Sequence, residues 1–88
     1  MKLRVEFKSD GGEVQTAVFD EATSTIVNDR GERAAFTYDA ESNAISLRSD
    51  AFNGTIHFEG APNRTVGATN RYRVSDGQTG VATILALD

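Results

Sequence analysis

The sequence predicts an all-β domain, built as a single small antiparallel meander of about eight strands that closes fully or partly into a barrel. Three observations lead to this fold class. Apolar and polar residues alternate with period two along most of the chain, turn residues recur about every eleven positions, and no stretch keeps a helical period for three turns. Because closing the meander removes exposed strand edges, we favour the barrel over the alternative, a two-sheet β-sandwich.

The first half of the chain consists of four alternating runs. In the first run Leu3, Val5 and Phe7 point one way, and the charged residues between them point the other. Residues 10–12 (DGG) form the first expected turn, and Gly31 is expected to supply a positive φ in a later one. The four runs cover residues 2–9, 13–19, 23–28 and 33–38.

The second half continues the pattern with four more runs. Asn43 is expected in the left-handed region of a hairpin loop, the pair Asn53-Gly54 is a strong turn signal, and Pro62 suits the second position of a turn. The last run is apolar on both faces, but its β-branched residues favour a strand over a helix. These runs cover residues 44–49, 55–59, 65–74 and 79–88.

Alternation gives each strand two faces without saying which one lines the interior. In the second run, for example, Val14, Thr16 and Val18 share one face, and Ala17 and Phe19 share the other. In a ligand-binding barrel even the more polar face can line the lumen. The side that each face takes is therefore left to the tertiary structure.

Length and composition indicate one domain, residues 1–88. A chain of 88 residues, 39% of them hydrophobic, supports a single core and is too short for two. The chain contains no Cys, which excludes a disulfide framework, a thiolate zinc site, an iron–sulfur cluster and a Cys nucleophile.

Charge and hydropathy narrow the class of partner and the compartment. The net charge is −4, with nine basic against thirteen acidic residues, so nucleic acid and anionic membrane surfaces are poor partners. No apolar run approaches the roughly 18 residues of a membrane span. The opening MKLRVEFKS has no apolar signal-peptide core. We expect a cytoplasmic protein, or a periplasmic or extracellular one whose leader has been removed.

The only His is a candidate ligand-binding residue. His57 projects to the face opposite Ile56 and Phe58, where Glu59 is a possible companion as a metal ligand or as a catalytic partner. A zinc site needs three or four protein ligands, and no second His or Cys exists to complete one. We therefore expect no metal and interpret His57 as a solvent-facing strand residue.

Two arginines and one aromatic residue complete the candidate binding residues. Arg71 and Arg73 share a strand face opposite Tyr72, and at a separation of about 7 Å they could clamp a carboxylate or phosphate. The favoured interpretation is that they form cross-strand ion pairs with acids such as Glu59. Phe52 lies in a loop, where it either plugs the end of the barrel or anchors a partner.

Two short motifs are better explained by turns than by chemistry. The triplets beginning at Asn53 and Asn63 fit the N-glycosylation pattern, and Asp39, Glu41 and Asn43 resemble the start of a calcium loop. The position where such a calcium loop needs Gly is occupied by Ala44. Hairpin geometry accounts for all of these residues.

The expected function is that of a non-catalytic binding domain without a cofactor. The likeliest partner is another protein, contacted through loop tips and one strand face, as in an inhibitor, an envelope accessory domain or an assembly module. The alternative is a small-ligand carrier, and a carboxylate-dependent hydrolase is a second alternative. The hairpin rhythm is similar to that of calycin-type barrels, although the G-x-W signature of lipocalin-type chains is absent because there is no Trp. A hollow interior would favour the carrier, and a packed one would exclude it.

Overall fold

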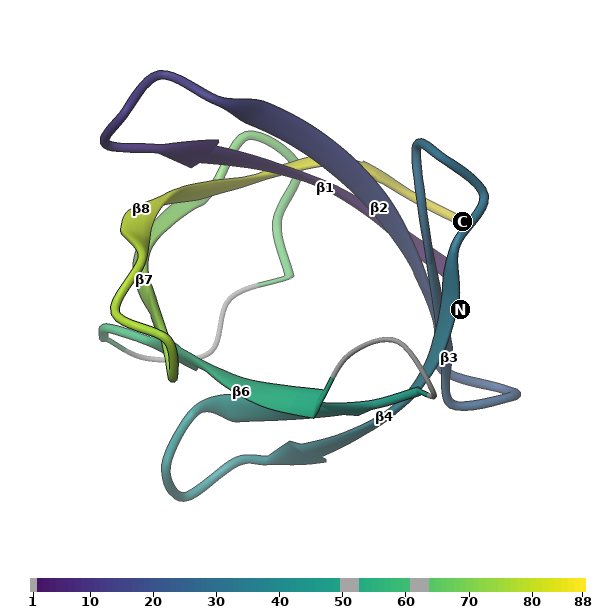
Figure 1. Ribbon diagram of the computed structural model, residues 1–88. Coiled ribbons are helices and arrows are strands. Elements are labelled where there is room, and N and C mark those ends of the chain that lie inside the picture. The colour runs from purple at the N-terminus through teal and green to yellow at the C-terminus, as the bar shows by residue number, and fades with distance from the viewer. Residues whose placement is uncertain (1, 50–52, 61–63) are drawn as a thin grey trace.

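The fold is a closed barrel of eight antiparallel strands, seen in a computed structural model that describes residues 2–49, 53–60 and 64–88 (Figure 1). The spatial order of the strands follows the chain, and β1 closes the ring by pairing with β8. The meander barrel predicted from alternation is therefore confirmed, and the sandwich alternative is wrong. The strands are β1 Lys2–Ser9, β2 Val14–Asp20, β3 Thr25–Asn28, β4 Arg33–Asp39, β5 Ala44–Arg48, β6 Asn53–Phe58, β7 Thr69–Val74 and β8 Thr79–Leu87.

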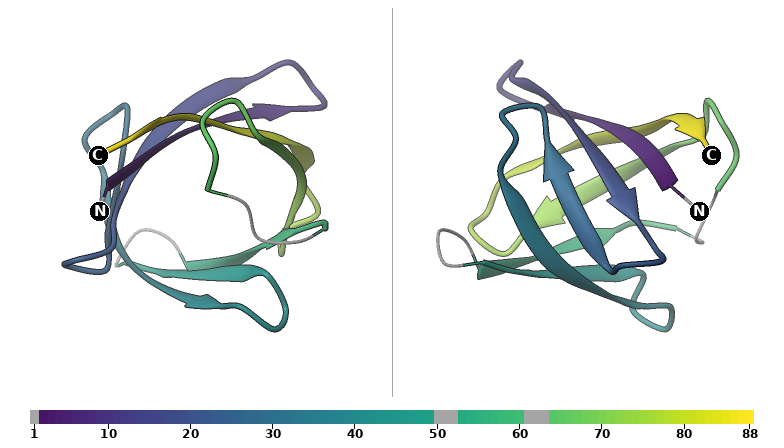
Figure 2. Two further views of the ribbon diagram at one scale, coloured as in Figure 1. Left: turned by 180° about the vertical axis from the view of Figure 1, so that it is seen from behind. Right: turned by 90° about the vertical axis from the view of Figure 1, so that its right-hand side faces the viewer.

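The barrel is short and about as wide as it is long, with extents of 29 × 27 × 27 Å (Figure 2). Its two ends differ. The hairpin end carries the β1–β2, β3–β4 and β7–β8 turns. The terminal end carries both chain termini, the β2–β3 and β4–β5 turns and the β6–β7 connection. Lys2 and Asp88 exchange two backbone hydrogen bonds there, of 3.0 and 2.9 Å, so the ring stays paired up to its last residue. Over the described residues, no helix is long and apolar enough to cross a membrane.

The structure decides which face of each strand lines the barrel. In β2 the inward residues are Ala17 and Phe19, 5% and 4% exposed, whereas Val14 is 55% exposed on the outside. The first run follows the predicted faces, because Val5 is buried and Leu3 and Phe7 pack against the core. The buried core cluster consists of Val5, Ala17, Phe19, Ile26, Ile45, Ile56, Tyr72 and Ala82.

A β-bulge near the end of β8 changes which of its last residues face inward. Arg4 pairs with Ala86 and Val5 with Ile84, so Leu85 is an extra residue without a partner on β1. Leu85 is 40% exposed and continues the outward positions of the strand, and the bulge shifts the alternation beyond it so that Leu87 pairs with the core-packing Leu3. The prediction of a strand over residues 79–88 is confirmed for Thr79–Leu87.

Two turns follow the sequence prediction, and two details near β6 and β7 differ from it. Gly31 and Asn43 have φ angles of +80° and +49°, as predicted. Asn53 and Gly54 are strand residues at the start of β6, because the β5–β6 ladder extends to pair Gly54 with Leu47. The run 65–74 is a strand only from Thr69, since Gly67 has a φ of +88°, which interrupts the extended backbone.

Candidate functional site

The interior of the barrel is hollow at both ends and closed in the middle by aromatic rings. Phe7 is the centre of this layer, with ring centroids 6.2 Å from Phe19, 6.5 Å from Phe58 and 5.4 Å from Tyr72, the last in an edge-on contact. Phe36 meets Phe19 edge-on at 5.4 Å. No described side chain is completely buried, and the core residues keep 4–8% of their surface exposed.

The large cavity opens at the hairpin end and has a volume of about 680 Å³. Alternate strand residues form its apolar wall, since inward positions of β1 to β7 converge there. Small side chains at Ala17 and Ala34 widen it. The larger apolar residues in the wall are Phe7, Ile26, Leu47, Ile56 and Val74.

Tyr72 brings a polar group into this apolar wall. The residue is 6% exposed, and its hydroxyl forms no hydrogen bond with any residue that the structure describes. Burial is the main reason that the pKa of Tyr72 is raised, with a further contribution from the negative charge of Asp10. The phenol is therefore neutral at pH 7, and its oxygen is available to a ligand as donor or acceptor.

Polar side chains surround the mouth of the large cavity. Glu32 accepts a hydrogen bond from Asn28 Nδ2 at 2.9 Å, and the Asp76 carboxylate accepts one from the backbone N–H of Gln78 at 3.0 Å. These local bonds fix the two acids in their turns and leave other carboxylate lone pairs unused. The polar or charged lining residues are Gln15, Asn28, Glu32, Arg33, Ser49, Asp76 and Gln78.

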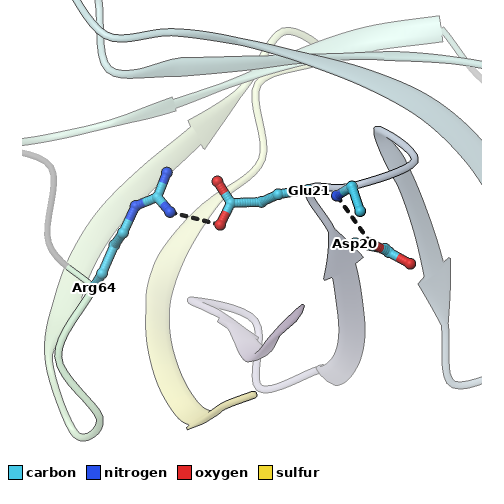
Figure 3. A network of polar contacts seen from close by, with 4 residues as sticks. Asp20, Glu21 and Arg64 are labelled. Atoms are coloured by element: carbon cyan, nitrogen blue, oxygen red, sulfur yellow. Dashed lines mark hydrogen bonds and ion pairs between the residues drawn. The ribbon is translucent and has the colours of Figure 1, made fainter. Parts of the chain in front are cut away.

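The small cavity lies at the terminal end and measures about 120 Å³. An ion pair crosses its mouth: Arg64 Nη1 lies 2.5 Å from Glu21 Oε1 (Figure 3). Glu21 belongs to the β2–β3 turn and Arg64 to the β6–β7 connection, which are four strands apart and so on opposite sides of the ring. In the same turn Asp20 Oδ1 accepts the backbone N–H of Ala22 at 3.0 Å, which holds Glu21 in place.

Asn43 links the β4–β5 turn to the β6–β7 connection at the terminal end. Its side-chain oxygen accepts a hydrogen bond from the Tyr38 hydroxyl at 2.8 Å, and its Nδ2 donates to the Gly60 carbonyl at 2.9 Å. Asn43 is 7% exposed and is the only buried polar residue among those described. The β6–β7 connection is also held by the backbone bond from Gly67 N–H to the Ile84 carbonyl, of 2.8 Å.

The predicted candidate residues that the structure describes, His57, Arg71 and Arg73, lie on outer strand faces. His57 is half-buried on the outer face of β6, paired opposite Arg73 of β7. Arg71 forms an ion pair with Asp10 at 2.8 Å, so the ion-pair interpretation holds for this residue with an acid other than Glu59. In the described part of the chain no three His, Cys, Asp or Glu side chains gather as metal ligands. Phe52 lies outside the described residues.

The lumen residues were not predicted as a site, although one signal was present. Glycine inside a strand often marks a close approach of other atoms, and Gly80 is such a residue in β8. A β-carbon at Gly80 would lie 2.7 Å from the Tyr72 hydroxyl oxygen. For Glu21 and Arg64 no local signal exists, because 43 residues separate them and only barrel closure brings them together.

Neither the protein-family models, nor the curated proteins, nor the solved structures contain a match to this chain. The candidate site is therefore defined by the geometry of the lumen alone.

Proposed function

We propose that this chain is a non-catalytic binding protein whose ligand is a small molecule held in the large cavity. The observation that supports the proposal is the volume of that cavity, about 680 Å³. Ligand pockets typically measure roughly 300–1,000 Å³ and combine apolar walls with a few polar groups. The apolar wall, the Tyr72 hydroxyl and the polar mouth match this description.

The small cavity is a poor candidate for the same role. At about 120 Å³ it lies well below the usual range for a ligand pocket. The Arg64–Glu21 ion pair also lies across its mouth. We therefore assign binding to the hairpin end.

The other two functions expected from the sequence stay predictions. A protein partner anchored by Phe52 depends on a residue outside the described chain. A carboxylate-dependent hydrolase requires a general acid with a raised pKa, and Asp10 has its pKa lowered instead. Neither prediction has a geometric observation of its own to favour it.

The proposal is tested by filling the large cavity. Ala34 faces the lumen and lines the cavity, whereas its neighbour Ala35 is exposed on the outer face of β4. We expect the neutral apolar dye N-phenyl-1-naphthylamine to fluoresce with the unmodified protein and with Ala35→Phe, and to bind at least about tenfold more weakly to Ala34→Phe. Circular dichroism checks the fold of both variants, and Val74→Phe is a second cavity-filling variant should Ala34→Phe not fold. Absence of dye binding to the unmodified protein, or equal binding to all variants, contradicts the proposal.

A further inference from the structure

We propose that the ligand of the large cavity is an amphiphilic cation, with an apolar body in the lumen and one ammonium group at the mouth. This inference rests on the proposed function and adds the chemical class of the ligand. Three observations carry it: the placement of two carboxylates at the mouth, the excess of these acids over cations among the described lining residues, and the hydroxyl of Tyr72, which has no partner among the described residues.

Two carboxylates line the mouth from opposite sides. Glu32 and Asp76 are both lining residues of the large cavity. Glu32 belongs to the β3–β4 turn and Asp76 to the β7–β8 turn, four strands apart in the ring. Both are exposed turn residues, one just before β4 and the other just after β7, at the rim of the cavity that they line. A ligand that enters the lumen passes between the two carboxylates.

Among the described residues that line the cavity, one cationic side chain accompanies these two acids. Arg33 also lines the mouth. It is the first residue of β4 and precedes the inward-facing Ala34, so it belongs to the outer face of that strand. Arg71 is on the outer face and is paired with Asp10, which also accepts a hydrogen bond from Thr79. Counting only the described lining residues, the mouth has two carboxylates and one guanidinium, and its field favours a positive head group.

The Tyr72 hydroxyl supplies a hydrogen-bond acceptor inside the apolar wall. The residue is more than nine-tenths buried, lines the cavity and leaves its hydroxyl without a partner among the described residues. The hydroxyl lies beside Gly80, whose partner Ser9 is the last residue of β1, so it stands toward the hairpin end that carries the two carboxylates. An ammonium group attached to an apolar chain can donate to this oxygen and lie near aromatic rings, an arrangement that attracts cations.

An anionic amphiphile of the same shape fits less well. Its carboxylate would stand between Glu32 and Asp76, with Arg33 as the cation that lines the cavity among the residues described. Like charges that face each other at an interface weaken binding. The cavity should therefore bind a cationic amphiphile more tightly than an anionic one with the same apolar body.

The test uses three probes with the same ten-carbon chain. Decylammonium, decanol and decanoate are titrated at pH 7 and low salt against the protein loaded with N-phenyl-1-naphthylamine. With charges a few ångströms apart near a surface, we expect decylammonium to displace the dye at about tenfold lower concentration than decanoate, with decanol between them. Added salt should narrow this ratio.

Variants test whether the preference for decylammonium over decanoate arises from the two mouth carboxylates and from Tyr72. The double variant Glu32→Gln with Asp76→Asn keeps both hydrogen-bond acceptors and should bring the ratio to within about twofold. Tyr72→Phe should weaken the binding of decylammonium more than the binding of decanoate. The matched control is Asp39→Asn with Glu41→Gln, which removes two charges at the terminal end and should leave the ratio unchanged.

The outcomes separate this inference from the proposed function. If the dye does not bind, the proposed function fails and the inference fails with it. If the dye binds and decanoate competes as well as decylammonium, the lumen is a binding site and the cationic class is wrong. A preference for decylammonium that survives the double variant likewise overturns the inference, because the preference would then arise elsewhere.

Discussion

The hydroxyl oxygen of Tyr72 lies 2.7 Å from the position that a β-carbon on Gly80 would take. The two residues are partners in the β7–β8 ladder, so Gly80 leaves the space over its own backbone that the tyrosine hydroxyl occupies. Gly80 is also buried against the Lys8 carbonyl of β1, which would meet the same β-carbon. Gly80 therefore allows β8 to pack closely against β1 where the barrel closes. It also leaves room for the Tyr72 hydroxyl, the only hydroxyl in the aromatic layer among the residues described.

Replacing Gly80 with alanine should destabilise the barrel. The added methyl group meets the Lys8 carbonyl and the Tyr72 hydroxyl, and overpacking of this kind costs about 1–3 kcal/mol of unfolding free energy. Urea unfolding measures the loss. Gly11→Ala is the control, since its β-carbon would meet only the Ser9 hydroxyl oxygen, at 3.8 Å. Adding Tyr72→Phe to Gly80→Ala should recover part of the loss and leave the part due to Lys8; full recovery would contradict the role of the carbonyl.

Asn43 should contribute through its backbone conformation and through its side chain. Asn43→Gly keeps the left-handed φ of +49° and loses the bonds to Tyr38 and Gly60. We expect a loss of about 1–3 kcal/mol for the two hydrogen bonds. Asn43→Ala should lose about 1 kcal/mol more, because a β-carbon disfavours this conformation. Chemical denaturation of both variants gives the difference, and an alanine variant as stable as the glycine variant would show that the φ angle carries no strain.

Asp10 should make part of the stability depend on pH. The hydrogen bond from Thr79 and then the hydrogen bond and charge of Arg71 hold the pKa of Asp10 below its ordinary value. The folded-state pKa is thus lower than the unfolded one. The stabilisation is complete above the unfolded pKa and is lost as pH falls through the lowered folded value. Carboxyl NMR titration should show a midpoint below the ordinary Asp value that moves up in Thr79→Val. Thr69→Val, on the exposed outer face of β7, should leave the midpoint in place.

The Glu21–Arg64 ion pair should affect local opening more than global stability. Both side chains are partly exposed, 31% and 53%, so Glu21→Gln is expected to change the free energy of unfolding by less than about 1 kcal/mol. The β6–β7 connection should nevertheless open more often. We expect hydrogen exchange at the Gly67 amide, which bonds to the Ile84 carbonyl, to speed up about two- to fivefold. Glu6→Gln on β1 is the charge-matched control. Unchanged exchange in Glu21→Gln would mean that the connection is held without the ion pair.

Local pattern was sufficient to predict the class of fold. Alternation located the strands, and the turn residues Gly31 and Asn43 have the positive φ angles expected from their types. The prediction was less accurate where a long-range ladder competes with a local signal. Asn53 and Gly54 form a good turn pair in isolation, yet pairing with β5 makes them strand residues. The extra residue Leu85 could not be predicted either, because a bulge depends on how two strands register.

The candidate site was not predictable in the same way. His57, Arg71 and Arg73 were singled out for their chemistry, and all three lie on the outer surface. Glu32, Asp76 and Tyr72 carried no distinguishing pattern in the sequence, and all three line the same cavity at one end of the barrel. Their placement around one cavity depends on which turns and strand ends the closed barrel brings to the same end.

The sequence by itself determined that this chain is one all-β meander, because a two-residue period acts over neighbouring positions and needs no partner to be recognised. Only the tertiary structure decided which face of each strand is the inside, that the interior is hollow at both ends, and that Gly80 makes room for Tyr72. Those features depend on strand register and on the total side-chain volume inside a ring of fixed width, and both are properties of the closed barrel rather than of any segment.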